Sequence, residues 1–128
     1  MVEQYRHGVD EITLELPGGM VEPNEDPGTA AERECLEETG YLGEGRAILL
    51  GDDFPNPAFM NNTHYCYVWH NCERVRRQSL DVNEDIEIIE VPPGDIRRMI
   101  LDKRIHHSLV LVAFMYYYMK YGTDFLKP

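Results

Sequence analysis

Residues 26–40 constrain the fold more than any other segment, because they carry the signals for both ends of a helix. Asp26 stands where an N-cap residue belongs, and Pro27 follows at the first helical position, where a missing N–H costs nothing. Good helix formers fill the segment up to Gly40, which supplies a C-terminal stop. We therefore expect one well-defined helix between these residues.

Three glutamates crowd one face of this expected helix. Glu37 and Glu38 follow Glu34 at i+3 and i+4, so the three carboxylates project within one turn of each other. Like charges at this spacing repel and destabilise an isolated helix. A solvated acidic face and a site for a divalent cation both account for the cluster, and hard cations such as Mg²⁺ prefer carboxylate oxygens.

Other elements are expected on both sides of this helix. Ile12, Leu14 and Leu16 alternate with polar residues, which indicates a half-buried strand that ends at Pro17-Gly18-Gly19. Similar patterns predict strands over residues 47–50, 64–70 and 85–91, and helices over 95–101 and 108–121. The last helix is apolar nearly all round in its first two turns, so it needs cover on several sides.

Size and charge exclude several classes of protein. With 128 residues the chain fits a single domain, 1–128, and it is too short for a separate substrate domain. A net charge of −11 argues against partners such as nucleic acid or an anionic membrane, which the chain would repel. The chain has neither a signal-peptide pattern nor an apolar run of membrane-spanning length, and its three cysteines favour reduced thiols in a cytoplasmic protein.

One motif unites the loop and the helix. Gly19, five residues, Glu25, seven residues, and then Arg-Glu-Cys-Leu-Glu-Glu-Thr-Gly-Tyr up to Tyr41 resemble the Nudix box of the Nudix hydrolase superfamily. Cys35 and Tyr41 fill two slots of that motif with mild departures. The resemblance implies an α+β fold, a Nudix-type α/β/α sandwich with a mixed β-sheet, and hydrolysis of a pyrophosphate bond in a nucleoside diphosphate derivative.

The same resemblance assigns roles to residues of the box. It implies that Glu37 and Glu38 ligate Mg²⁺, with Mn²⁺ as a possible substitute, and that Glu34 ligates metal or helps to activate water. The carbonyl of Gly18 is a further candidate ligand. Two scaffold residues are implied as well: Glu25 would hold the loop, and Arg33 would pair with a carboxylate.

The flanking residues point to a branch of the superfamily. Gln4-Tyr5-Arg6, Glu15-Leu16-Pro17-Gly18-Gly19 and Pro57, sixteen residues after Tyr41, look like the branch that hydrolyses ADP-ribose and nucleotide sugars. Arg6 is a candidate for gripping a substrate phosphate, although a surface arginine at a strand end explains it equally well. Pro57 is a candidate substrate-binding position for a nucleotide, the small-molecule partner that this branch implies.

The segment 80–87 resembles the acidic loop that helps to position or deprotonate the attacking water in this branch. Val82 stands where that loop usually has a glutamate, which puts the identity of the base in doubt. Glu84, and after it Asp81, are the nearest substitutes. The departure keeps an alternative open, namely a non-catalytic nucleotide-binding or assembly module that retains the box; an acidic metal-buffering protein is a third reading.

Two further expectations concern ligands and assembly. His64, Cys66, His70 and Cys72 alternate as if along one strand, but ligands spread along a straight strand cannot close a tetrahedral zinc site.

In the resembling branch, some tens of residues precede the Gln-Tyr-Arg motif, so we expect a domain that is short at its N-terminus and lacks strands there. The apolar last helix then predicts a homodimer, the commonest oligomeric state.

Overall fold

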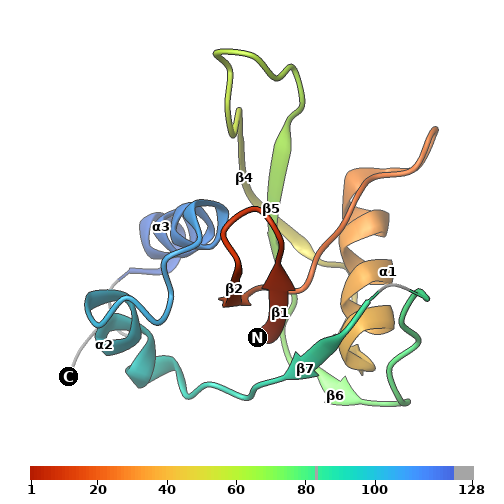
Figure 1. Ribbon diagram of the computed structural model, residues 1–128. Coiled ribbons are helices and arrows are strands. Elements are labelled where there is room, and N and C mark those ends of the chain that lie inside the picture. The colour runs from red at the N-terminus through yellow and green to blue at the C-terminus, as the bar shows by residue number, and fades with distance from the viewer. Residues whose placement is uncertain (83, 123–128) are drawn as a thin grey trace.

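A computed structural model describes residues 1–82 and 84–122 of the chain (Figure 1). The strands are β1 (Val2–Arg6), β2 (Glu11–Glu15), β3 (Tyr41–Leu42), β4 (Ile48–Asp53), β5 (His64–Val68), β6 (Glu73–Arg74) and β7 (Ile86–Ile88). The helices are α1 (Pro27–Thr39), α2 (Ile96–Leu101) and α3 (Ser108–Tyr121), with a 3₁₀ turn, η1 (Pro93–Asp95), before α2. This mixture confirms the expected α+β class.

Strands occupy the middle of the molecule, with α1 on one side and α2 and α3 on the other (Figure 1). They form a three-stranded sheet in the order β2-β1-β7 and two two-stranded sheets, β4-β5 and β3-β6. All these pairings are antiparallel. Tyr5 pairs with Ile12, and Val2 with both Glu15 and Ile88, so β1 is the central strand of its sheet.

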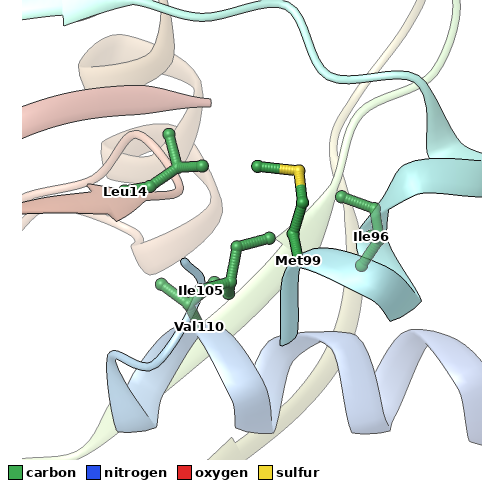
Figure 2. Packing of buried hydrophobic residues seen from close by; sticks show 5 residues of the cluster. All are labelled: Leu14, Ile96, Met99, Ile105 and Val110. Atoms are coloured by element: carbon green, nitrogen blue, oxygen red, sulfur yellow. The ribbon is translucent and has the colours of Figure 1, made fainter. Parts of the chain in front are cut away.

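The hydrophobic core lies between the three-stranded sheet and the last two helices. Its buried members are Leu14 of β2, Ile96 and Met99 near α2, Ile105 in the connection that follows, and Val110 of α3 (Figure 2). Leu14 faces this cluster from the strand that leads into the Gly18-Gly19 loop. The core therefore anchors one end of the loop whose other end enters α1.

Strand β2 corrects one expectation from the alternating pattern. Leu14 is buried, but Ile12 is 67% exposed, whereas Thr13 and Glu15 on the opposite face are buried. The reason is that both faces of β2 are covered near its C-terminal end, while its N-terminal end extends past the core. A period-two pattern reveals which residues share a face but not how far the cover extends.

Several element boundaries also differ from the sequence-based expectation. The strand expected over 64–70 ends at Val68, and Asn71 beyond it has a left-handed conformation with φ of 51°. Strand β4 continues to Asp53 through Gly51. The two-residue strands β3 and β6 were not expected from the sequence, because so short a segment has no periodicity.

Helix α3 is covered on only part of its surface. Val110 and Ala113 are buried, whereas Met115, Tyr118 and Met119 are exposed.

In the described part of the chain, no helix has the length and apolar character needed to cross a membrane.

Candidate active site

Helix α1 is held at both ends by the residues that the sequence indicated. The Asp26 carboxylate accepts a hydrogen bond of 3.0 Å from the backbone N–H of Thr29, and Pro27 occupies the first helical position. Gly40 ends the helix in the left-handed conformation, with φ of 74°, and donates its N–H to the carbonyl of Leu36 at 2.9 Å. The expected helix is therefore confirmed.

A loop containing two glycines lies against the glutamate-bearing face of α1. The backbone N–H of Gly18 donates to Oε2 of Glu38 at 2.9 Å. A Cβ atom on Gly19 would overlap the carboxylate of Glu34, so this side chain would have to shift if the glycine were replaced. The loop therefore lies close to α1 at the carboxylates of Glu34 and Glu38.

Arg33 organises the outer side of the same cluster. Its Nε and Nη2 atoms donate to the two carboxylate oxygens of Glu25 at 2.9 and 3.1 Å, a bidentate pair. Its Nη1 atom reaches Glu34 at 2.8 Å and Glu37 at 3.0 Å, and Nη2 also donates to the carbonyl of Met20. Glu25 and Arg33 therefore have the scaffold geometry that the resemblance implied.

Glu38 is the most buried acid of the cluster, with 4% of its surface exposed. Burial raises its pKa to about 7, against the opposing effect of the hydrogen bond from Gly18. The negative charges of Glu34 and Glu84 contribute to this raised pKa of about 7. Three acidic groups thus share one electrostatic environment, which a cation would stabilise.

Glu84 of the acidic loop lies near enough to Glu38 for its charge to raise the pKa of that acid. Glu84 closes a tight turn with Asp81: the N–H of Asp81 donates to the Glu84 carboxylate, and the N–H of Glu84 donates to the Asp81 carbonyl, both at 3.0 Å. Val82, where the resembling loop has glutamate, is fully exposed. Residue 83 of this loop lies outside the described residues.

Arg6 is engaged with a partner that the sequence analysis did not single out. Its Nε and Nη2 atoms donate to both oxygens of the buried Glu15 carboxylate, each at 2.7 Å. Arg6 also lies near enough to Glu38 to lower the pKa of that acid. The signal that could have revealed Glu15 is its place as the last strand residue before Pro17-Gly18-Gly19, where a charged residue needs a partner.

Pro57 is not brought to the carboxylates by any interaction among the described residues. It is exposed in the connection between β4 and β5, in a turn where the Asn56 carbonyl accepts from Phe59 and Met60. The structure therefore groups five of the predicted site residues near α1: Gly18, Glu34, Glu37, Glu38 and Glu84. Arg6 lies close enough to affect the pKa of Glu38, whereas Pro57 lies in the separate connection between β4 and β5.

The comparisons with known proteins agree with this geometry. The model of the NUDIX domain matches residues 1–111, so the chain belongs to the Nudix family. Its relatives include several named as pyrophosphatases of ADP-ribose, of ADP-sugars and of GDP-mannose.

Two relatives align with almost the whole chain. The methanol dehydrogenase activator of Bacillus methanolicus is 33% identical over 91% of this chain and 63% of its own length. The ADP-ribose pyrophosphatase of Bacillus subtilis (strain 168) is 25% identical over 94% of this chain and 65% of its own length. The chain thus spans slightly less than two thirds of either relative.

A third relative, the GDP-mannose pyrophosphatase of Yersinia pestis (strain Pestoides F), is 24% identical over the full chain and 68% of its own length. The names of these relatives differ in substrate and, in one case, in role. They support the ADP-ribose and nucleotide-sugar branch without selecting one substrate.

Proposed function

We propose that this chain is a metal-dependent pyrophosphohydrolase of nucleoside diphosphate derivatives, with ADP-ribose or a nucleotide sugar as substrate. Its products would be a nucleoside monophosphate and a sugar phosphate. The observation that carries the proposal is the burial of Glu38 among other acids, beside a glycine loop that binds its carboxylate through the backbone. Such a carboxylate favours a cation as its neighbour.

The donors around Glu38 suit Mg²⁺. Every candidate is an oxygen: the carboxylates of Glu34, Glu37 and Glu38 and the carbonyl of Gly18. Hard cations prefer this donor set, whereas none of these candidates is a sulfur or an imidazole, the donors that favour zinc. When bound, the ion would neutralise the pyrophosphate and lower the pKa of an attacking water.

The remaining residues would orient the reactants. The attacking water forms a new P–O bond, the bridging P–O bond breaks, and the bridging oxygen leaves with the second phosphate. Glu84 would accept the proton of the water, since the usual glutamate position is Val82. Arg6 would bind a substrate phosphate with the guanidinium edge that Glu15 leaves open, and Pro57 would contact the nucleotide.

The test is release of phosphate monoesters from ADP-ribose, nucleotide sugars, dinucleoside polyphosphates and nucleoside triphosphates, with Mg²⁺, Mn²⁺ or EDTA. We expect one substrate class to be cleaved and Glu38→Gln to lose at least about 100-fold in rate, because outer-shell changes alone cost 10–100-fold. Glu32→Gln is the matched control. Glu32 lies on the same helix, but its carboxylate accepts from Ala47 and pairs with Arg46 instead.

A second candidate function has specific support. Val82 replaces the expected glutamate, and the relative from Bacillus methanolicus is named as an activator of another enzyme. A non-catalytic nucleotide-binding or assembly module would bind ADP-ribose and Mg²⁺ without turnover. Binding in a calorimeter with no product release across the panel would replace the hydrolase proposal with this one.

We also propose that residues 1–128 form a single domain and that two copies pair as a homodimer. The support is the exposed apolar stripe of Met115, Tyr118 and Met119 on α3, since such residues lie on one side of a helix. Light scattering should give twice the 14.9 kDa mass of one chain. A monomer at all concentrations would refute the pairing.

A further inference from the structure

Three side chains with metal-binding atoms lie together on the β4–β5 hairpin, outside the cluster described above. They are Asp53, His64 and Cys66, and their ligand atoms all lie within 4.8 Å of one another. Nδ1 of His64 is 3.1 Å from Oδ2 of Asp53 and 3.7 Å from Sγ of Cys66. Among the described residues, no other histidine, cysteine or acidic side chains form a group this compact.

A β-bulge brings the three residues together. The register of the hairpin shifts between Leu49 and Gly51, which adds one residue to β4. Asp53 consequently pairs with His64; without the shift, Asp52 would take that position. Directly opposed residues of an antiparallel pair project on the same side, so the carboxylate and the imidazole meet.

The cluster faces α3 and not the glutamates of α1. Tyr67 lies on the α1 side, since a Cβ on Gly28 of α1 would be 3.3 Å from its ring. Neighbouring residues of a strand alternate, so Cys66 projects to the other side. There its partner across the hairpin is Gly51, and a Cβ on Gly51 would be 2.6 Å from the ring of Tyr116 in α3.

The spacing of the donor atoms is close to the spacing around a tetrahedral ion. Zinc bonds of about 2.0–2.1 Å to nitrogen and oxygen and about 2.3 Å to sulfur put N and O about 3.3 Å apart and N and S about 3.6 Å apart. The hairpin holds these pairs at 3.1 and 3.7 Å. Because Sγ of Cys66 is also 3.7 Å from Nε2 of His64, and so lies equally far from both ring nitrogens, the imidazole must turn for one nitrogen to bind the same ion as the sulfur.

The donor chemistry and exposure select the ion. Nitrogen, sulfur and oxygen together suit a borderline-soft cation and not Mg²⁺. Cys66 is buried, but the side chains of Asp53 and His64 are 23% and 21% exposed, which leaves access from solvent. We propose that Asp53, His64 and Cys66 bind one Zn²⁺ ion, with water in the fourth position.

This arrangement explains why the sequence pattern alone was insufficient. His70 and Cys72, which continue the alternation, lie beyond the end of β5; His70 packs on Tyr121, and the Cys72 thiol donates to the Trp69 carbonyl at 3.3 Å. The third ligand comes instead from the neighbouring strand. A second strand removes the objection that ligands along one straight strand cannot surround an ion.

The test is titration of the full chain with Co²⁺, a spectroscopic probe for zinc sites. A Co²⁺–thiolate bond produces an intense near-ultraviolet charge-transfer band, whereas Co²⁺ on carboxylates alone does not. We expect this band to saturate at one Co²⁺ per chain and to disappear on addition of Zn²⁺. Cys66→Ser should abolish it, and Cys72→Ser should leave it unchanged.

A second pair of variants guards against misfolding at the buried cysteine. Asp53→Asn changes a partly exposed ligand and should weaken Co²⁺ binding at least about 10-fold. Asp52→Asn is the matched control on the adjacent residue and should have no effect. No band in the wild type, a band that survives Cys66→Ser, or equal weakening by the two aspartate variants would overturn the proposal.

The zinc site stands apart from the proposed hydrolase activity, and the same titration separates the two. Glu38→Gln should keep the thiolate band while it loses turnover. Asp53→Asn should lose metal affinity at the hairpin whether or not any substrate is hydrolysed.

Discussion

Replacement of Gly40 by alanine tests how α1 is joined to the rest of the protein. Gly40 ends this helix with φ of 74°, and its carbonyl accepts the N–H groups of Val75 and Arg76. A Cβ at this position would overlap the backbone carbonyl of Arg76. Backbone cannot rotate away as a side-chain end can, so either the helix end or the segment around β6 must move.

The magnitude follows from two separate contributions. An alanine forced into the left-handed region costs about 1–2 kcal/mol, and overpacking against fixed atoms costs about 1–3 kcal/mol more. We therefore expect Gly40→Ala to lower the free energy of unfolding by about 2–5 kcal/mol. Gly45→Ala is the matched control, because Gly45 has φ of 66° but open space around its Cβ position, so it should lose only about 1–2 kcal/mol.

Urea unfolding followed by circular dichroism measures both losses. With a slope of about 1–3 kcal/mol/M, a loss of 2 kcal/mol lowers the midpoint by about 0.7–2 M. Gly40→Ala should have the lower midpoint of the two variants. Equal midpoints would refute the reasoning, because they would show that the approach to Arg76 adds nothing to the conformational cost.

Three further predictions concern other contacts. Glu15→Gln should cost about 1–3 kcal/mol of stability at pH 7. Burial opposes ionisation of Glu15, but hydrogen bonds from Arg6 and Thr13 bring its pKa below the ordinary 4.5, so this loss should shrink as urea unfolding is repeated at pH values falling below 4.5. Gly51→Ala should lower stability by about 1–3 kcal/mol in urea, because its Cβ would meet an aromatic ring at 2.6 Å. Arg33→Lys should reduce turnover of the identified substrate by about 10–100-fold in a product-release assay, since an ammonium cannot reproduce the bidentate pair with Glu25.

Local signals were sufficient for α1 and for the loop before it. Asp26, Pro27 and Gly40 act within a few residues of their own position, through a cap, a fixed φ and a left-handed stop. The spacing of Glu34, Glu37 and Glu38 follows from the helical period alone. For this reason, the sequence by itself indicated the family and the candidate metal ligands of its box.

Long-range partners could not be obtained in this way. The pairing of Arg6 with Glu15 depends on the register of β1 against β2, and the exposure of Ile12 depends on where the core ends. Neither the register between two strands nor the extent of the core can be derived from the alternation of residues within one strand. For Pro57, similarly, the sequence gives only the spacing from Tyr41. The residues near it are determined by the fold of the β4–β5 hairpin.

The Asp53, His64 and Cys66 cluster shows this division most clearly. The sequence determined that His64 and Cys66 share one side of a strand, because side chains alternate with a period of two. Only the tertiary structure decided that Asp53 joins them, because a single extra residue in β4 shifts the register by one and exchanges it with Asp52. The bulge ends at Gly51, where a Cβ would meet the ring of Tyr116 in α3, so the packing at this point becomes visible only when the distant helix is in place.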